Sequence, residues 1–304
     1  MISPATLADA PAIAALGAVV SPHRLNSIRG VQHRQRTVPA DARRQQWKVE
    51  RDGTLVAYAV AGLDWLATEP GRSFCGLEVH PERRGQGLGS ALWDVVAGHL
   101  AEIGARKTTA FTLDDAPSAT FAEHRGFRKT STDTLSATDP TTLPPPPEPP
   151  DGVLLRPAAA WVGDPRPIYE LDVAGGADEP GDNDLSGMTF ELWLDDTWSD
   201  PDLDTDLSTV AVVDGKPVSF SMLMVDPGTG RAVSGFATTL PEYRGRGLAG
   251  LCKRRTLAKA AEHGITHAMT YNDETNAPML AINRRLGYRP FTTAHRWRRV
   301  TPEP

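Results

Sequence analysis

The sequence predicts an α/β protein built from two tandem copies of one fold. The main observation is a repeated glycine-rich turn, Arg-Gly-x-Gly, which starts at Arg84 and again at Arg244, each time after Pro-Glu. The two turns lie 160 positions apart, and the Gly-aromatic pairs that start at Gly126 and Gly287 lie 161 apart. A nearly constant offset over a whole domain indicates duplication. A proline-rich stretch, residues 139–152, separates the copies.

Composition fits two ordinary globular domains. The chain has 304 residues, a net charge of -6 and 40% hydrophobic residues, which supply enough apolar material for two cores. The acidic balance argues against nucleic-acid binding, which needs a basic field. No apolar run approaches the roughly 18 residues of a membrane span, and the N-terminus lacks a signal-peptide pattern. Two cysteines far apart in sequence predict neither a disulfide framework nor a metal site. We therefore expect a cytoplasmic protein.

The first half alternates strand-like and helical patterns around its turn. Asp52-Gly53 separates two short apolar runs, which is a strong hairpin signal. After the turn, apolar residues recur at helical spacing from Leu88 to Leu100, and Gly104 ends the pattern. The expected elements are a helix over 9–20, strands over 47–51, 55–62 and 72–80, a helix over 87–104, a strand over 107–113 and a helix over 117–125.

The second half repeats this order, with Asp214-Gly215 at its hairpin. The expected elements are a strand over 153–156, a helix over 161–173, strands over 207–213, 217–226 and 231–240, a helix over 247–263, a strand over 267–271, a helix over 276–286 and closing strands to 300. Consecutive prolines between the halves favour an extended, semi-rigid spacer. The predicted organisation is an N-terminal domain over 1–138, a linker over 139–152 and a C-terminal domain over 153–304.

A strand that runs into a glycine-rich turn and then a helix forms an anion site. The first helical turn presents free backbone N–H groups and the positive end of the helix dipole. Glycine lets the backbone approach a phosphate and adopt φ values that other residues avoid. No Gly-Lys-Ser/Thr follows, so neither turn is a Walker loop. A single copy could be no more than a tight connection, but two copies at matching places predict a functional site.

The chain resembles the GNAT (GCN5-related) N-acyltransferase superfamily, whose motif is Q/R-x-x-G-x-G/A. The motif is present from Arg84 to Gly89 and from Arg244 to Ala249. The order of the surrounding elements is similar as well, and the tandem layout resembles that of mycothiol synthase and related two-domain acyltransferases. This resemblance implies two mostly antiparallel mixed sheets flanked by helices. In each, a V-shaped splay opens between the fourth strand, which precedes the turn, and the fifth.

The resemblance also implies acetyl-CoA, or another short acyl-CoA, as the cofactor. Its pantetheine arm would lie between the splayed strands and its pyrophosphate on the turn amides, and an amine would attack the thioester directly. The cofactor-binding residues implied in the first half are Val79, Arg84, Gly85, Gln86, Gly87, Leu88, Gly89 and Ser90. Those implied in the second half are Thr239, Leu240, Arg244, Gly245, Arg246, Gly247, Leu248, Ala249 and Asn276.

The two halves differ where the family places functional side chains. The Asn that often contacts the cofactor corresponds to Asn276 in the second half and to Asp115 in the first. A carboxylate close to an anionic cofactor would repel it. The family's frequent Tyr, which protonates the leaving thiolate, corresponds to Asn283 and Ala122. We therefore hypothesise that the C-terminal domain catalyses and that the N-terminal domain is weakened or structural.

Three residues are candidates for catalytic roles. Tyr271, at the end of a strand, could replace the missing family Tyr, although a core or rim position is the alternative. An attacking ammonium must lose a proton, and Glu78 on the strand before the first turn could accept it. The matching position in the second half is Thr238, which could orient a water. Cys75 and Cys252 fit small packing residues rather than nucleophiles.

The acceptor is expected to bind beside the acid-rich stretch 178–206, which contains no Lys or Arg. Carboxylates interleaved with tryptophans suit a cationic amine through charge attraction and cation–π contact, which makes Trp193, Asp196 and Trp198 the candidate substrate residues. The alternative is a solvated acidic loop whose Asp residues serve as turn caps.

Three functions remain open. The first is an N-acetyltransferase acting on a small cationic amine, such as a polyamine, an aminoglycoside-like compound or an amino-acid derivative. The second is mycothiol-synthase-like acetylation of a cysteine-containing thiol precursor. The third is a non-catalytic acyl-CoA sensor or scaffold. We expect a small amine partner, neither nucleic acid nor membrane, and a monomer or homodimer.

Overall fold

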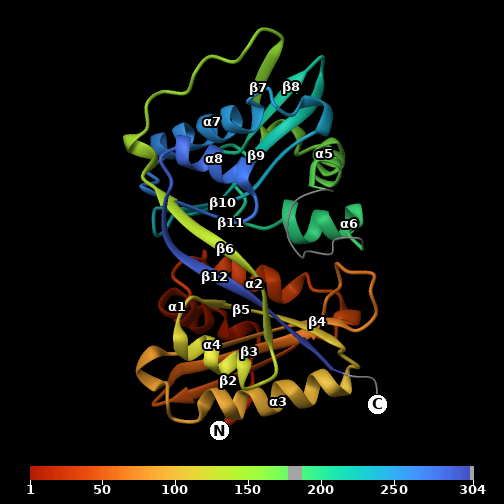
Figure 1. Cartoon of the computed structure of the whole chain (residues 1–304), viewed down its shortest axis with the longest axis vertical. Coiled ribbons are helices and arrows are strands. Elements are labelled where there is room, and N and C mark those ends of the chain that lie inside the picture. Colours follow the sequence, from red (N-terminus) through yellow and green to blue (C-terminus); the bar gives the residue numbers. More distant parts are fainter. Residues whose placement is uncertain (177–186, 302–304) are drawn as a thin grey trace. The chain divides into compact units, whose positions relative to one another are not determined.

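The computed structural model describes residues 1–176 and 187–301 (Figure 1). These residues form two compact units. Unit 1 comprises residues 1–132, 187–192 and 293–301, and unit 2 comprises residues 133–176 and 193–292. Across these described ranges we find no helix with both the length and the apolar character needed to span a bilayer.

Unit 1 is a mixed sheet with helices on both faces. Its sheet order is β1-β2-β3-β4-β5-β12, in which β4 and β5 pair in parallel and the other neighbours are antiparallel. Asp52 and Gly53 adopt positive φ at the β2–β3 hairpin, as the sequence predicts. The elements are β1 Ile2–Pro4, α1 Ala10–Val20, α2 Ile28–Arg36, β2 Gln45–Arg51, β3 Thr54–Leu63, β4 Arg72–Val79, α3 Leu88–Glu102, β5 Lys107–Leu113, α4 Ala116–Glu123 and β12 Arg289–Val300.

Unit 2 repeats this architecture with sheet order β6-β11-β10-β9-β8-β7. Its parallel pair is β10 and β11, and Asp214 and Gly215 form the β8–β9 hairpin with positive φ. The elements are β6 Arg128–Thr138, β7 Val153–Pro157, α5 Arg166–Gly176, α6 Phe190–Trp193, a π-helical turn Leu194–Trp198, β8 Thr209–Val213, β9 Lys216–Asp226, β10 Arg231–Thr239, α7 Leu248–Glu262, β11 His267–Asp273 and α8 Ala277–Arg285. The predicted fold class is confirmed, with two copies of one mixed α/β fold.

Alternation along β3 explains why helices cover both faces of unit 1. Ala57, Ala59 and Ala61 are fully buried in the cluster that contains Leu92 and Val96 of α3. The intervening Tyr58 is buried in a second cluster, with α1 and Val31 of α2. Successive side chains of a strand point to opposite faces, so α3 and the α1–α2 pair lie on opposite sides of the sheet.

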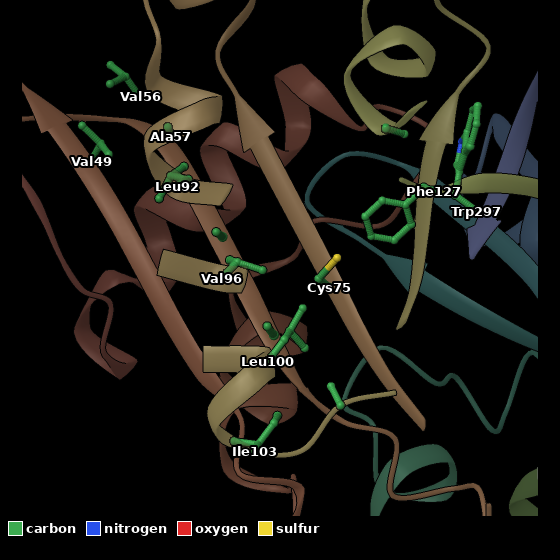
Figure 2. Packing of buried hydrophobic residues seen from close by; sticks show 14 residues of the cluster. Val49, Val56, Ala57, Cys75, Leu92, Val96, Leu100, Ile103, Phe127 and Trp297 are labelled. Carbon is green, nitrogen blue, oxygen red and sulfur yellow. The ribbon is translucent and has the colours of Figure 1, made fainter. Parts of the chain in front are cut away.

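Each half of the chain contributes its last strand to the sheet that the other half mainly forms. Residues 133–138 of β6, from the N-terminal half of the chain, pair with β11 of unit 2, and residues 294–300 of β12, from the C-terminal half, pair with β5 of unit 1. Figure 2 shows Trp297 of β12 beside Phe127 in the core of unit 1. The predicted division into 1–138 and 153–304 therefore differs from the compact units, because β6 and β12 each complete the sheet formed by the other half.

The predicted linker is not entirely a free spacer. Leu143 packs against the cluster of Leu257, Leu286 and Tyr288 in unit 2. The Arg254 guanidinium donates a 3.3 Å hydrogen bond to the carbonyl of Pro144. The first part of the proline-rich segment thus contacts α7 and the cluster around α8, and residues 144–150 form no helix or strand.

Replacing Trp297 should destabilise unit 1 although the residue comes from the C-terminal half. Its side chain is 3% exposed and its indole N–H donates to Thr112 at 2.9 Å, so Trp297→Ala should cost about 3–5 kcal/mol of unfolding free energy. Val300→Ala on the same strand is the control, because Val300 is 67% exposed. Hydrogen exchange should show lost protection in β2–β4 for Trp297→Ala only. Lost protection confined to unit 2 would contradict the strand exchange.

Candidate active site

The two glycine-rich turns have nearly identical geometry. Gly85 and Gly245 have φ +74°, and Gly87 and Gly247 have φ +79° and +78° as the residues that begin α3 and α7. A side chain at these φ values is strained, which accounts for glycine at all four positions. A Cβ placed on any of them would meet no atom within 4 Å. Open space therefore lies over the first N–H groups of each helix.

Side chains of the turn hold its backbone in place. Arg84 Nε donates to the carbonyl of Val79 at 3.3 Å, and Arg244 Nε donates to that of Thr239 at 3.2 Å. The two arginines thus tie each turn to the end of the strand before it. In the second turn Arg246 also donates to the carbonyl of Glu242 at 3.0 Å. These internal contacts hold both turns in the same geometry, so the arginines position the turn.

The strands before and after each turn separate, as predicted. The pairing of β4 with β5 ends at Phe74 and Thr109, although β4 continues to Val79. The pairing of β10 with β11 ends at Val233 and Met269, where β10 also contains a register shift. The unpaired ends of these strands are called the opening below, and the turn follows directly after β4 and after β10. The residues present therefore fit an elongated ligand with an anionic group, as an acyl-CoA is.

The other residues predicted to bind the cofactor differ in exposure and contacts. Leu240 and Leu248, which precede and follow the second turn in sequence, are buried. In unit 1, the Phe121 ring packs against Gly89, and Arg125 stacks on that ring 3.4 Å from its centroid. Arg125 also donates to Ser90 at 2.8 Å, which brings a positive charge to the first turn of α3.

Asn276 and Asp115 have the same local role. Asn276 accepts a hydrogen bond from the Met279 backbone at 3.2 Å, and Asp115 accepts one from the Ser118 backbone at 2.8 Å. Each side chain is the N-cap of the helix that follows it. This pair therefore gives no support to the predicted difference between the halves, which has to rest on other residues.

The structure places the three catalytic candidates in different surroundings. Tyr271 lies beyond the last β10–β11 pair, is 44% exposed, and its hydroxyl lies over Gly235 of β10. Thr238 packs against Gly175 of α5, so tightly that a side chain at Gly175 would overlap its hydroxyl. Glu78 accepts a 3.0 Å hydrogen bond from Ser21 at the end of α1. Tyr271 and Glu78 thus lie on the separated parts of their strands, whereas the Thr238 side chain is occupied by packing.

A buried polar network in unit 2 was not predicted. Lys253 of α7 is 1% exposed and donates to Asn283 Oδ1 at 2.7 Å and to Thr270 at 3.4 Å. Asn283 in turn donates to Asn272 Oδ1 at 2.7 Å. Burial lowers the pKa of Lys253 to about 7. The network joins α7 and α8 to β11 just where β11 leaves β10.

Unit 1 has apolar residues at the matching positions. Trp93 corresponds to Lys253 and Ala122 corresponds to Asn283 by the repeat offset. Trp93 makes an edge contact with Phe127, with ring centroids 5.6 Å apart. The polar interior beside the β10–β11 opening is therefore specific to unit 2. In the sequence Lys253 belongs to the run Lys253-Arg254-Arg255, which gives no sign of which of the three side chains is buried.

The candidate substrate residues differ in how far their side chains are exposed to solvent. Trp193 is 3% exposed, and its indole N–H donates to Asp172 Oδ2 at 2.8 Å, so it lies inside unit 2. Trp198 stacks on Trp193 with a centroid distance of 5.5 Å and is partly exposed, as is Asp196. Asp172 itself, on α5, was not predicted.

Part of the acid-rich stretch consists of turn caps, which is the alternative that the sequence left open. Asp200 accepts from the backbone of Asp202 at 2.8 Å, and Asp204 accepts from that of Leu207 at 2.9 Å. The acids at 178, 179, 182 and 184 lie outside the described residues.

Cys75 and Cys252 are buried free thiols, and burial raises the pKa of each to about 12. A thiol that stays protonated is a poor nucleophile. Their surroundings match the predicted packing role.

A cavity of about 560 Å³ in unit 1 lies between α4 and β12, away from both turns. Asp114, Phe127, His295 and Trp297 contribute to its lining. None of the turn residues does, so this cavity is separate from the candidate active site.

Comparisons with known proteins agree with this geometry. Residues 25–127 and 178–288 each match the model of the acetyltransferase (GNAT) family. Mycothiol acetyltransferase from Nocardioides sp. is 27% identical over 225 residues, which cover 70% of this chain and 75% of the relative. Mycothiol acetyltransferase from Acidothermus cellulolyticus is 27% identical over 275 residues, which cover 81% of this chain and 76% of the relative.

Solved structures show the same fold over the full chain. A tandem GNAT protein from the clavulanic acid biosynthesis pathway superposes with a TM-score of 0.74 at 20% identity, covering 100% of this chain and 99% of that one. A GCN5-related N-acetyltransferase from Sphaerobacter thermophilus gives 0.72 at 23% identity, covering 100% and 96%. With two matches to the family model and a tandem fold, the chain belongs to the acetyltransferase (GNAT) family and is an acyl-CoA-dependent N-acyltransferase.

Proposed function

We propose that the chain transfers the acetyl group of acetyl-CoA to a primary amine of a small cationic metabolite, and that unit 2 performs the reaction. The observation that carries this proposal is the separation of β10 from β11 after Val233 and Met269, ahead of the Gly245–Gly247 turn that begins α7. Polar residues gather beside this opening in unit 2, where unit 1 has Trp93 and Ala122.

Separate residues of unit 2 can bind the cofactor, position the turn and donate a proton. The N–H groups at the start of α7 and the glycine turn bind the diphosphate, and Arg244 fixes the turn to β10. Acetyl-CoA supplies an activated thioester. Tyr271 lies on the separated part of β11 and is exposed, whereas the Thr238 hydroxyl is packed against Gly175, so Tyr271 is the candidate suited to donate a proton to the departing thiolate.

The second candidate acceptor is a cysteine-containing thiol precursor whose amine is acetylated. The two mycothiol acetyltransferases at 27% identity favour it. Asn283 stands where the resemblance places the Tyr that protonates the leaving thiolate, so this reaction too would need another proton donor, such as Tyr271.

Release of free CoA thiol decides between these functions. The full chain would be incubated with acetyl-CoA and, separately, with a polyamine, an aminoglycoside, an amino-acid amide and a cysteine-containing amino sugar. Release with the cationic amines supports the first candidate, and release with the cysteine compound alone supports the second. Binding of acetyl-CoA without release for any acceptor would replace both with an acyl-CoA sensor.

A further inference from the structure

The α5 helix of unit 2 carries a carboxylate on the face that packs against the sheet. Ile168 and Leu171 are buried on this face, Gly175 is buried against Thr238 of β10, and Asp172 is partly buried among them. Residues three and four apart on a helix share one face. Asp172 therefore points towards the sheet side of α5, where a charged residue is costly unless it is paired or hydrogen-bonded.

Gly175 fixes the position of α5 relative to the glycine turn. Its carbonyl accepts a 2.9 Å hydrogen bond from Arg244, the same arginine that binds the end of β10. Gly175 also lies in direct contact with Thr238, on the part of β10 that has separated from β11. Because Asp172 is three residues before Gly175, it lies on the same face of α5 as the residue that contacts the separated part of β10.

One aromatic side chain, that of Trp193, contacts this carboxylate, and two further rings contact Trp193. Trp193 donates its indole N–H to Asp172 Oδ2 at 2.8 Å. The Trp193 ring contacts Tyr169 at a centroid distance of 5.7 Å and stacks on Trp198 at 5.5 Å. Trp198 is partly exposed, so the group presents both an accessible aromatic ring and an anion. An ammonium ion is the chemical group that binds both.

We propose that Asp172, held by Trp193 on which Trp198 stacks, binds the ammonium group of the acceptor and removes its proton. This inference rests on the proposed function, since it names the group that receives the acceptor of that reaction. In the step, one N–H bond breaks, the proton passes to Asp172, and the nitrogen keeps the electron pair as a neutral amine. The protonated Asp172 returns the proton to water after the product leaves.

The pKa of Asp172 suits this role. Burial raises it to about 6, and the hydrogen bond from Trp193 opposes that rise. Such a carboxylate is ionised at neutral pH, so it attracts an ammonium, and it is a stronger base than an exposed Asp.

Three variants test the assignment in the full chain. Asp172→Asn keeps an oxygen for the Trp193 N–H and removes the charge. Trp198→Leu removes the accessible ring. Glu170→Gln is the matched control, because Glu170 lies on the exposed side of the same helix and loses the same charge. Near-ultraviolet circular dichroism verifies that each variant is folded.

Binding is measured first, by tryptophan fluorescence and calorimetry with ethylammonium, spermidine and alaninamide. We expect Asp172→Asn to weaken the binding of these amines at least tenfold and Trp198→Leu to weaken it several-fold, with Glu170→Gln unchanged. Acetyl-CoA should bind all four proteins equally. Wild-type protein that binds none of the three amines, or Asp172→Asn that binds them as the wild type does, would overturn the proposal.

Turnover separates this proposal from the proposed function. With an amine that supports CoA release, Asp172→Asn should lower kcat/KM for the amine at least 100-fold and leave KM for acetyl-CoA unchanged. Equal turnover in the wild type and in Asp172→Asn would overturn the role of Asp172 and leave the N-acetyltransferase function standing. Amine binding that depends on Asp172 without CoA release from any acceptor would retain the ammonium site and overturn the transferase function.

Discussion

Gly247→Ala is expected to lower the affinity for acetyl-CoA at least about tenfold. The residue has φ +78° at the start of α7, and a side chain there is strained by about 1–2 kcal/mol. The added methyl would occupy the open space over the N–H groups, where the diphosphate is expected to bind. Loss of one charge-assisted hydrogen bond costs about 1.5–3 kcal/mol, and 1.4 kcal/mol corresponds to about a tenfold change in affinity.

The opposite end of the same helix supplies a matched control. Gly264 follows α7 with φ +79°, and a Cβ there would also meet no atom within 4 Å. Gly264→Ala should therefore destabilise unit 2 as much as Gly247→Ala does and leave acetyl-CoA affinity unchanged. Isothermal titration calorimetry and thermal unfolding, measured together, distinguish the two effects. Equal loss of affinity in both variants would show that stability rather than the turn controls binding.

Lys253→Met is expected to change how the stability of unit 2 depends on pH. Burial lowers the pKa of Lys253 from 10.5 to about 7 in the folded unit. Between these values the unfolded chain binds a proton that the folded chain does not, so wild-type stability increases as pH rises and is lost as pH falls towards 7. The increase is up to about 1.4 kcal/mol for each pH unit.

Methionine fills a similar volume and does not titrate, so this increase should disappear in the variant. Asn283 loses its donor at the same time, which costs about 1–3 kcal/mol. Urea unfolding at pH 7, 8 and 9 measures both effects. Lys216→Met is the control, because Lys216 is exposed with 60% of its side-chain surface accessible. Parallel pH dependences for wild type and Lys253→Met would mean that Lys253 is not buried in solution.

Local patterns in the sequence predicted the elements of the fold. The two Asp-Gly pairs have the positive φ that their hairpins require, and the glycines of both turns begin helices. These features depend on neighbouring residues, so a single sequence reveals them. The exchange of β6 and β12 depends on pairing between strands more than 100 residues apart, and the alternating pattern of a strand does not identify its partner.

The candidate site was predictable to a similar extent. The turn, Tyr271 and Trp198 could be selected because their residue types or motif are distinctive. Asp172 and Lys253 could not, because a charged residue in a helix is usually exposed, and only the packed structure shows these two facing inwards. The hypothesis that the second half catalyses now rests on these two residues rather than on Asn276.

Turnover of the two turn variants tests the central claim most directly. CoA release with a cationic amine would be followed for Gly247→Ala and for Gly87→Ala, whose turns have the same φ within a degree. The account predicts that Gly247→Ala loses turnover and that Gly87→Ala retains most of the wild-type rate. Equal loss in both variants, or loss in Gly87→Ala alone, would contradict the assignment of the reaction to unit 2.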